Sequence, residues 1–128
     1  MIVIDTHVLI WYATAREILS AAAMDTIEGT DVIGVSAITP WEIAVKVAAG
    51  RYDIVGDMRS WMDSALSFPR VRLLPLLPEI SIRSAELRSK VGNDPADCVI
   101  VATSLHFNAP LVTRDRAIHR SGVTSCIW

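Results

Sequence analysis

Short apolar runs alternate with longer segments of helical spacing along the chain, and this alternation limits the possible folds more than any other feature. The runs that read as buried strands are Ile2–Ile4, Val32–Ala37, Val71–Leu76, Leu111–Thr113 and Val123–Ile127. The segments with helical spacing are Ala15–Ile27, Pro40–Ala49, Met58–Leu66, Glu79–Val91 and Pro95–Phe107, and a shorter helix is expected after Asp5. Apolar strands separated by helices predict an α/β fold, with a central, mostly parallel β-sheet flanked by α-helices on both faces.

Length and composition are those of one folded domain. The chain has 128 residues, of which 52% are hydrophobic, and it contains no linker, repeat or low-complexity tract. We therefore expect residues 1–128 to form a single domain. The longest run without Asp, Glu, Lys or Arg, Cys98 to Thr113, includes His106, Asn108 and Pro110, so no membrane span is expected.

The cysteines and the N-terminus suggest a compartment. Cys98 and Cys126 are far apart and lack metal-ligand spacing, which favours reduced, packed thiols in a cytoplasmic protein. The first residues are apolar but have no basic stretch, and Asp5 and His7 interrupt them, so they are read as part of the fold and not as a signal peptide.

The net charge of the chain gives it no general attraction to nucleic acid. The formal net charge is −2, but a net charge says little about a local patch. Arg114, Arg116 and Arg120 are close together in the sequence, with Asp115 as the one acid among them. A basic rim beside an acidic centre is therefore compatible with this composition.

Two stretches place a carboxylate in the first turn of an apolar helix. In "DPAD", Asp94 fits a helix N-cap, and Asp97 falls at the third helical position. In "TPWE", Thr39 fits the cap and Glu42 falls three residues later, which is the spacing of a capping box. Capping alone, at about 1 kcal/mol, and the helix dipole, at about 0.3–1 kcal/mol, would account for each stretch taken singly.

Two further carboxylates follow strands. Asp5 comes directly after the first strand, and Asp115 comes two residues after "LVT", where ligands bind in parallel sheets. If Asp5, Glu42, Asp97 and Asp115 converge, capping no longer suffices, because two carboxylates about 4 Å apart repel by roughly 4 kcal/mol at an effective dielectric of 20. Such a cluster needs protons or a cation, and oxygen ligands suit Mg²⁺ or Mn²⁺. Periodicity alone does not bring Asp97 to this edge, because it follows a helix.

Four stretches, "VIDTHVLIWY", "SAITPWEIAVK", "DPADCVIVATS" and "LVTRD", occur in the order and spacing that resemble the PIN-domain nucleases. The resemblance is closest to the VapC toxins of type II toxin–antitoxin pairs, and it covers the chain from its first residues to Asp115. Gly92 and Cys98 stand where many relatives carry His and Arg, which affects the expected RNA contacts more than the acidic residues.

This resemblance implies a PIN-like fold and assigns roles to the acidic residues. Asp5 and Asp97 would be the principal metal ligands, Asp115 would complete the site directly or through water, and Glu42 would bind metal or orient a metal-bound water. Thr6 and Thr113 fall where the family often has hydroxyls that support these ligands, although ordinary backbone hydrogen bonding would explain them equally well.

The activity implied is that of a Mg²⁺- or Mn²⁺-dependent endoribonuclease, in which a metal-activated water hydrolyses the RNA phosphodiester bond. Lys46, Arg114 and Arg116 are candidate phosphate contacts, although Lys46 could simply pair with Glu42 four residues earlier. The expected partners are RNA, a cognate VapB-type antitoxin and a second copy in a homodimer, with Met58–Leu66 as a possible contact or ordinary core. The histidines lack metal-ligand spacing, so His7, His106 and His119 are assigned to packing or helix surface.

Two other functions are alternatives for a chain with these residues. A PIN-like nucleic-acid-binding or regulatory module without turnover is the main alternative, although an intact acidic quartet favours a nuclease. A phospho-acceptor receiver domain would need an adjacent acidic pair near the end of the first strand, whereas "IVID" offers only Asp5.

Overall fold

A five-stranded, fully parallel sheet forms the centre of the protein in a computed structural model that describes residues 1–128. Its strands lie in the order β3-β2-β1-β4-β5 across the sheet; β1 has the predicted bounds, and the other four are shorter than the apolar runs suggested. They are β1 (Ile2–Ile4), β2 (Ile33–Ser36), β3 (Val71–Leu74), β4 (Leu111–Val112) and β5 (Cys126–Ile127). The predicted α/β class is confirmed, and every strand pair is parallel.

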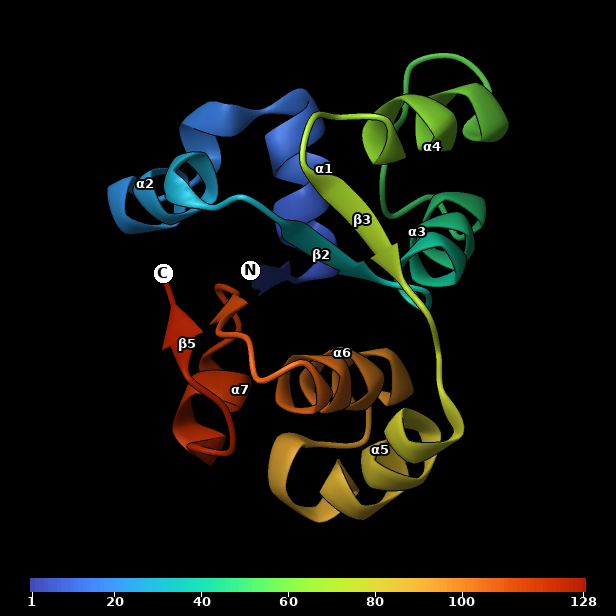
Figure 1. Cartoon of the computed structure of the whole chain (residues 1–128). Helices are drawn as coiled ribbons and strands as arrows, with labels where there is room; N and C mark the ends of the chain where they lie inside the picture. The colour runs from blue at the N-terminus through green and yellow to red at the C-terminus, as the bar shows by residue number, and fades with distance from the viewer.

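Helices cover both faces of this sheet, with α1 to α4 on one side and α5 to α7 on the other (Figure 1). Their bounds are α1 (Thr6–Thr14), α2 (Ala21–Gly29), α3 (Thr39–Ala48), α4 (Met58–Leu66), α5 (Pro78–Val91), α6 (Pro95–His106) and α7 (Arg116–Ser121). None of these helices is long and apolar enough to cross a membrane. Cys98 and Cys126 are both free thiols.

Two helix predictions need correction. The single helix predicted at Ala15–Ile27 is instead a 3₁₀ turn (Arg16–Ile18) and then α2, because Leu19 is extended and Ser20 starts a new helix by accepting a hydrogen bond from Ala23 N–H. The alternation also missed α7, whose six residues include only one buried side chain, Ile118. So short a helix has no apolar period to reveal it.

Strand alternation divides the core into two clusters. Ile2 and Ile4 of β1 pack in the cluster below α1 to α4, whereas Val3 between them packs against α5 and α6. Gly34 of β2 is required for this packing, since a Cβ there would lie 2.6 Å from Leu74 Cδ1 and 3.0 Å from Ile2 O. The sheet is therefore buried on both faces, as apolar strands predict.

The strand order reverses beside β1. The chain runs outward from β1 through β2 to β3, and α5 and α6 then return it to β4, which pairs with the free side of β1. Ligand sites in open parallel sheets lie beyond the carboxyl ends of the strands at such a reversal. Asp5 and Thr113 directly follow the two strands that meet there.

Candidate metal centre

Asp5 is a buried carboxylate at the carboxyl end of β1, with only 2% of its surface exposed. Its Oδ1 accepts a hydrogen bond from Thr6 N–H at 2.6 Å, and its Oδ2 accepts one from the Thr113 hydroxyl at 2.5 Å. Burial raises the pKa of the Asp5 carboxyl above its usual value, although His7 and the Thr113 hydroxyl act in the opposite direction. These donors hold the side chain in one orientation.

Glu42 enters the same site from α3 and is also buried. The Thr6 hydroxyl donates to its Oε2 at 2.5 Å, and Lys46 forms an ion pair with its Oε1. Burial acts to lower the pKa of Lys46, but its hydrogen bond to Glu42 and the Glu42 charge outweigh burial and raise it. Lys46 therefore makes the i,i+4 pair that was the alternative to phosphate contact.

The capping box predicted for α3 is wrong. The N-cap is Ile38, and Thr39 is already the first helical residue, with no side-chain cap. The Thr39 hydroxyl lies instead 3.3 Å from that of Thr6, on the buried side of the helix. Because α3 begins one residue earlier than predicted, Glu42 is free of a capping role and faces the site.

Asp97 lies where the acidic side chains converge. The carboxylate oxygens of Glu42, Asp94 and Asp97 lie within 4.8 Å of one another. Burial raises the pKa of Asp97 to about 7, and the charges of Asp5, Asp94, Glu42 and Asp115 all act in the same direction. Apolar periodicity could not place Asp97 beside the acids that follow strands. The packing of α6 places it there.

Asp94 caps a helix and also lies among the acidic side chains, a position that the sequence did not reveal. As predicted it is the N-cap of α6, where its Oδ1 accepts from Ala96 N–H at 2.9 Å. Its carboxylate also lies within 4.8 Å of those of Glu42 and Asp97. The position of Asp94 three residues before Asp97 was the available signal.

Asp115 is the N-cap of α7. Its Oδ1 accepts from the backbone N–H groups of Ala117 and Ile118 at 2.6 and 3.0 Å, and its own N–H donates to the Thr113 hydroxyl oxygen at 3.0 Å. Its Oδ2 makes no hydrogen bond within the chain, and its charge contributes to the raised pKa of Asp97. Asp115 therefore caps a helix and still offers one oxygen to the site.

His7 also belongs to this centre, contrary to its assignment to packing. Its Nε2 accepts a hydrogen bond from Arg114 N–H at 3.0 Å, which places the ring proton on Nδ1, 3.3 Å from Asp5 Oδ2. The ring thereby links the end of β1 to the loop that carries Asp115. Because Arg114 lies 107 positions further along the chain, no local pattern announces this contact.

The donor set fits a hard divalent cation. It consists of carboxylate oxygens, with neither a thiolate nor an imidazole among the converging group of Glu42, Asp94 and Asp97. Carboxylates this close repel one another unless protons or a cation offset their charge. The raised pKa of Asp97 to about 7 reflects this repulsion together with burial.

Two cavities border the acidic centre. One, of about 470 Å³, is lined by His7, Trp11, Tyr52, Arg114, Asp115 and Arg116. The other, of about 540 Å³, is lined by Arg114, Arg116, His119, Arg120 and Trp128. Arg114 and Arg116, which were predicted to contact phosphate, are thus beside Asp115.

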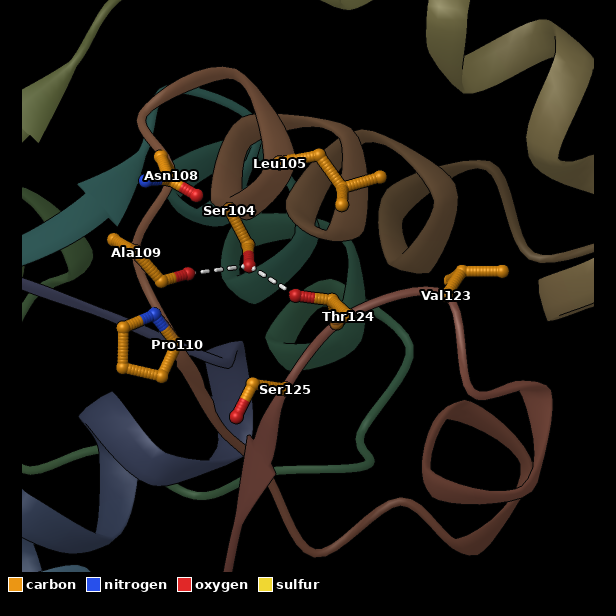
Figure 2. A pocket seen from close by; sticks show the side chains of 8 residues that line it. All are labelled: Ser104, Leu105, Asn108, Ala109, Pro110, Val123, Thr124 and Ser125. Atoms are coloured by element: carbon orange, nitrogen blue, oxygen red, sulfur yellow. Dashed lines mark hydrogen bonds between the residues drawn. The ribbon is translucent and has the colours of Figure 1, made fainter.

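A further cavity of about 310 Å³ lies at the opposite end of β4 and β5, before each strand begins (Figure 2). Its lining includes no titratable side chain. Ser104 donates to Ala109 O and shares a hydrogen bond with Thr124, both at 2.7 Å (Figure 2). The hydroxyls of Ser104 and Thr124 are thus bonded to each other, and none of the acidic residues of the centre lines this cavity.

Comparison with known families identifies the fold. The PIN domain family matches residues 2–123. The chain belongs to the PIN domain family. This PIN domain is 30% identical over 129 residues to Ribonuclease VapC22 of Mycobacterium tuberculosis (strain ATCC 25618 / H37Rv), an alignment that covers 99% of this chain and 98% of that protein.

Solved structures share the architecture of this PIN domain. VapBC2 from Rickettsia felis, bound to a DNA fragment from its promoter, has a TM-score of 0.70 and 18% identity, and the match covers 98% of this chain and 97% of that chain. FitAcB from Neisseria gonorrhoeae has a TM-score of 0.69 and 21% identity, with 98% and 96% covered. The predicted PIN-like fold is confirmed.

Proposed function

We propose that this PIN domain is a divalent-metal-dependent endoribonuclease and the toxin of a VapBC-type toxin–antitoxin pair. The observation that carries the proposal is the group of Glu42, Asp94 and Asp97, whose carboxylate oxygens lie within 4.8 Å of one another, with Asp5 and Asp115 close enough for their charges to raise the pKa of Asp97. Membership of the PIN family and the similarity to a VapC ribonuclease support RNA as the substrate. We expect the activity in the cytoplasm, where the two free cysteines would stay reduced.

The acidic side chains would hold Mg²⁺ or Mn²⁺, with Asp5 and Asp97 as principal ligands and Glu42, Asp94 and Asp115 around them. When bound, the ion supplies an activated water and neutralises charge that develops on the phosphate. Thr6 and Thr113 orient the carboxylates of Glu42 and Asp5 through their hydroxyls. Arg114 and Arg116 lie beside Asp115, where a phosphate of the RNA backbone can reach them.

The first experiment measures cleavage of total RNA by the purified protein, free of antitoxin, with Mg²⁺, with Mn²⁺ and with EDTA. Asp5→Asn and Asp97→Asn should each reduce the rate by more than about 100-fold, since even groups that only support metal ligands contribute 10–100-fold. Arg72→Ala, an exposed site on the edge strand β3, is the matched control. Cleavage by both Asn variants at the wild-type rate would show that the assigned site is wrong.

The proposed partners are a VapB-type antitoxin and a second copy of the chain. Trp61 and Met62 of α4 are half-buried and pack against the core, so α4 offers less free apolar surface than expected. Among the large apolar side chains that are exposed, Trp41 and Val45 are four residues apart on α3 and so share one face of that helix. We therefore assign the homodimer contact to α3, and Val45→Glu should shift the mass measured by light scattering from dimer to monomer.

The alternative is a PIN-like binding module without turnover. It predicts that RNA binds but that no product accumulates with either metal ion. A time course of defined RNA with Mn²⁺, measured beside Asp97→Asn, separates the two functions.

A further inference from the structure

We propose that the cavity lined by Arg114, Arg116, His119, Arg120 and Trp128 binds single-stranded RNA on one side of the scissile phosphate. This cavity, called the α7 cavity below, has a volume of about 540 Å³. The inference rests on the proposed nuclease function, because it treats the acidic centre as the point of cleavage.

The first observation is the charge of the α7 cavity. Three of its five lining residues are arginines, and none is acidic. The side chains of Arg114, Arg116 and Arg120 make no ion pair or hydrogen bond within the chain, and all three residues are exposed. Since the molecule has a formal net charge of −2 and its metal centre is acidic, a polyanion needs a local cationic surface of this kind to approach.

The second observation is continuity with the acidic centre. Arg114 and Arg116 line both the α7 cavity and the neighbouring cavity that contains Asp115 and His7. The two cavities therefore share a wall, and a strand that leaves the acidic centre past Asp115 meets Arg116 and then Arg120, one helical turn further along α7. Arg114, Arg116 and Arg120 all follow β4, in the loop and the helix that carry Asp115, so this cationic surface lies on the Asp115 side of the centre.

Aromatic rings favour an unpaired strand over a duplex. Trp128 in the α7 cavity and Trp11 in its neighbour have ring centroids 5.7 Å apart, and Arg114 Cζ lies 5.9 Å from the centroid of Trp11. Both tryptophans are only partly buried. Bases can stack on such partly exposed rings. The faces of the bases are free in a single strand, whereas inside a duplex they are stacked on neighbouring base pairs.

Hydrogen bonds fix the α7 cavity relative to the metal centre. His119 Nε2 lies 2.8 Å from Thr113 O at the end of β4, and Arg114 N–H donates to His7. The positions of Arg116 and Arg120 are thereby coupled to Thr113, whose hydroxyl holds Asp5. Because residues of the site hold this cationic surface in place, it would orient the RNA relative to the metal centre as well as attract it.

The test is the binding of a fluorescent, unstructured 12-nucleotide RNA, measured by anisotropy in EDTA at several salt concentrations. Each phosphate contact to a single strand steepens the plot of log K against log salt by about 0.7. We expect Arg116→Ala and Arg120→Ala each to flatten the slope by about 0.7 and to weaken binding several-fold. Arg120→Lys should keep the slope because it keeps the charge, and Arg72→Ala on the opposite edge of the sheet should match wild type.

Cleavage then tests the one-sided placement. RNAs lengthened on the 5′ or the 3′ side of the cleaved bond should gain kcat/KM on one side only, and Arg120→Ala should remove most of that gain. Equal gain on both sides, or a gain that Arg120→Ala leaves intact, would overturn the proposal. Equal affinity for a duplex of the same sequence would overturn the single-strand assignment.

Two outcomes separate this inference from the proposed function. If wild type binds the RNA with the expected dependence on Arg116 and Arg120 but cleaves nothing with Mg²⁺ or Mn²⁺, the α7 cavity stands as an RNA site and the nuclease proposal fails. If an acidic 12-residue peptide binds with that dependence while RNA binding ignores both arginines, the cavity takes a protein partner and the inference is wrong.

Discussion

At the scale of single residues, two threonines position the side chains of Asp5 and Glu42 and the backbone of Asp115. Thr6 donates from its backbone to Asp5 and from its hydroxyl to Glu42. Thr113 donates from its hydroxyl to Asp5, and the same oxygen accepts from Asp115 N–H. Both threonines are fully buried, so loss of either hydroxyl leaves a buried polar partner unsatisfied, which costs about 1–3 kcal/mol.

Replacement of Thr113 tests this support directly. Thr113→Val, which keeps the shape but loses the hydroxyl, should lower the free energy of unfolding by about 1–3 kcal/mol. It should also weaken Mn²⁺ binding by about 10–100-fold. Urea unfolding and titration calorimetry measure the two effects. Thr113→Ser keeps the hydroxyl and should restore Mn²⁺ affinity, and a Ser variant as weak as Val would show that packing, not the hydrogen bond, is what matters.

At the scale of elements, α6 connects the core to the site. Its side chains are all buried from Cys98 to Ser104, and it lies between the sheet and α5. Asp97 therefore sits in the first turn of a helix that has little freedom to move. The same turn is capped by Asp94, whose carboxylate faces Glu42 and Asp97.

The capping role of Asp94 and its proposed role in metal binding can be separated by substitution. Asp94→Asn keeps a capping oxygen for Ala96 N–H, so the stability of metal-free protein should change by less than about 0.5 kcal/mol. Mn²⁺ should bind more weakly because one carboxylate charge is gone. Asp94→Ala should in addition lower the free energy of unfolding by about 1 kcal/mol. Equal Mn²⁺ affinity of Asp94→Asn and wild type would exclude Asp94 from the metal site.

At the scale of the whole molecule, the acidic centre makes stability depend on pH. The pKa of Asp97 is raised from 3.8 to about 7 by burial and by the neighbouring carboxylates, and burial raises that of Asp5. The pKa of Asp97 is 3.8 in the unfolded chain and about 7 in the folded protein. At a pH between these two values, the folded protein keeps a proton that the unfolded chain releases. The free energy of unfolding of metal-free protein therefore falls as pH rises through this window and levels off above about 7.

Thermal unfolding followed by circular dichroism in EDTA, from about pH 4 to pH 8, measures this dependence. We expect the midpoint to fall as pH rises and the fall to be smaller in Asp97→Asn, which has no carboxylate at that position. Mn²⁺ should raise the midpoint most at high pH, because metal competes with protons for the same oxygens. A midpoint that rises with pH in wild type but not in Asp97→Asn would contradict the raised pKa.

The sequence by itself determined the α/β class, the five strands, most helices and the helix cap at Asp94. These features depend on apolar periodicity and on hydrogen bonds between residues a few positions apart, and both can be read from a short stretch of sequence. It failed where local rules compete, as in the predicted helix Ala15–Ile27 and the cap at Thr39, and where a helix is as short as α7.

The tertiary structure decided which acids share a site. Thr113 and Asp5 are 108 positions apart, and they meet because β4 pairs with β1 at the reversal of strand order. Asp97 joins them because α6 packs against the sheet with its first turn toward this edge. For the same reason, local sequence patterns could not predict that Asp94, His7 and the α7 cavity lie beside the acidic centre. Strand order and helix packing arise from contacts across the whole chain, so the charges that they bring together have no signature in any one stretch of sequence.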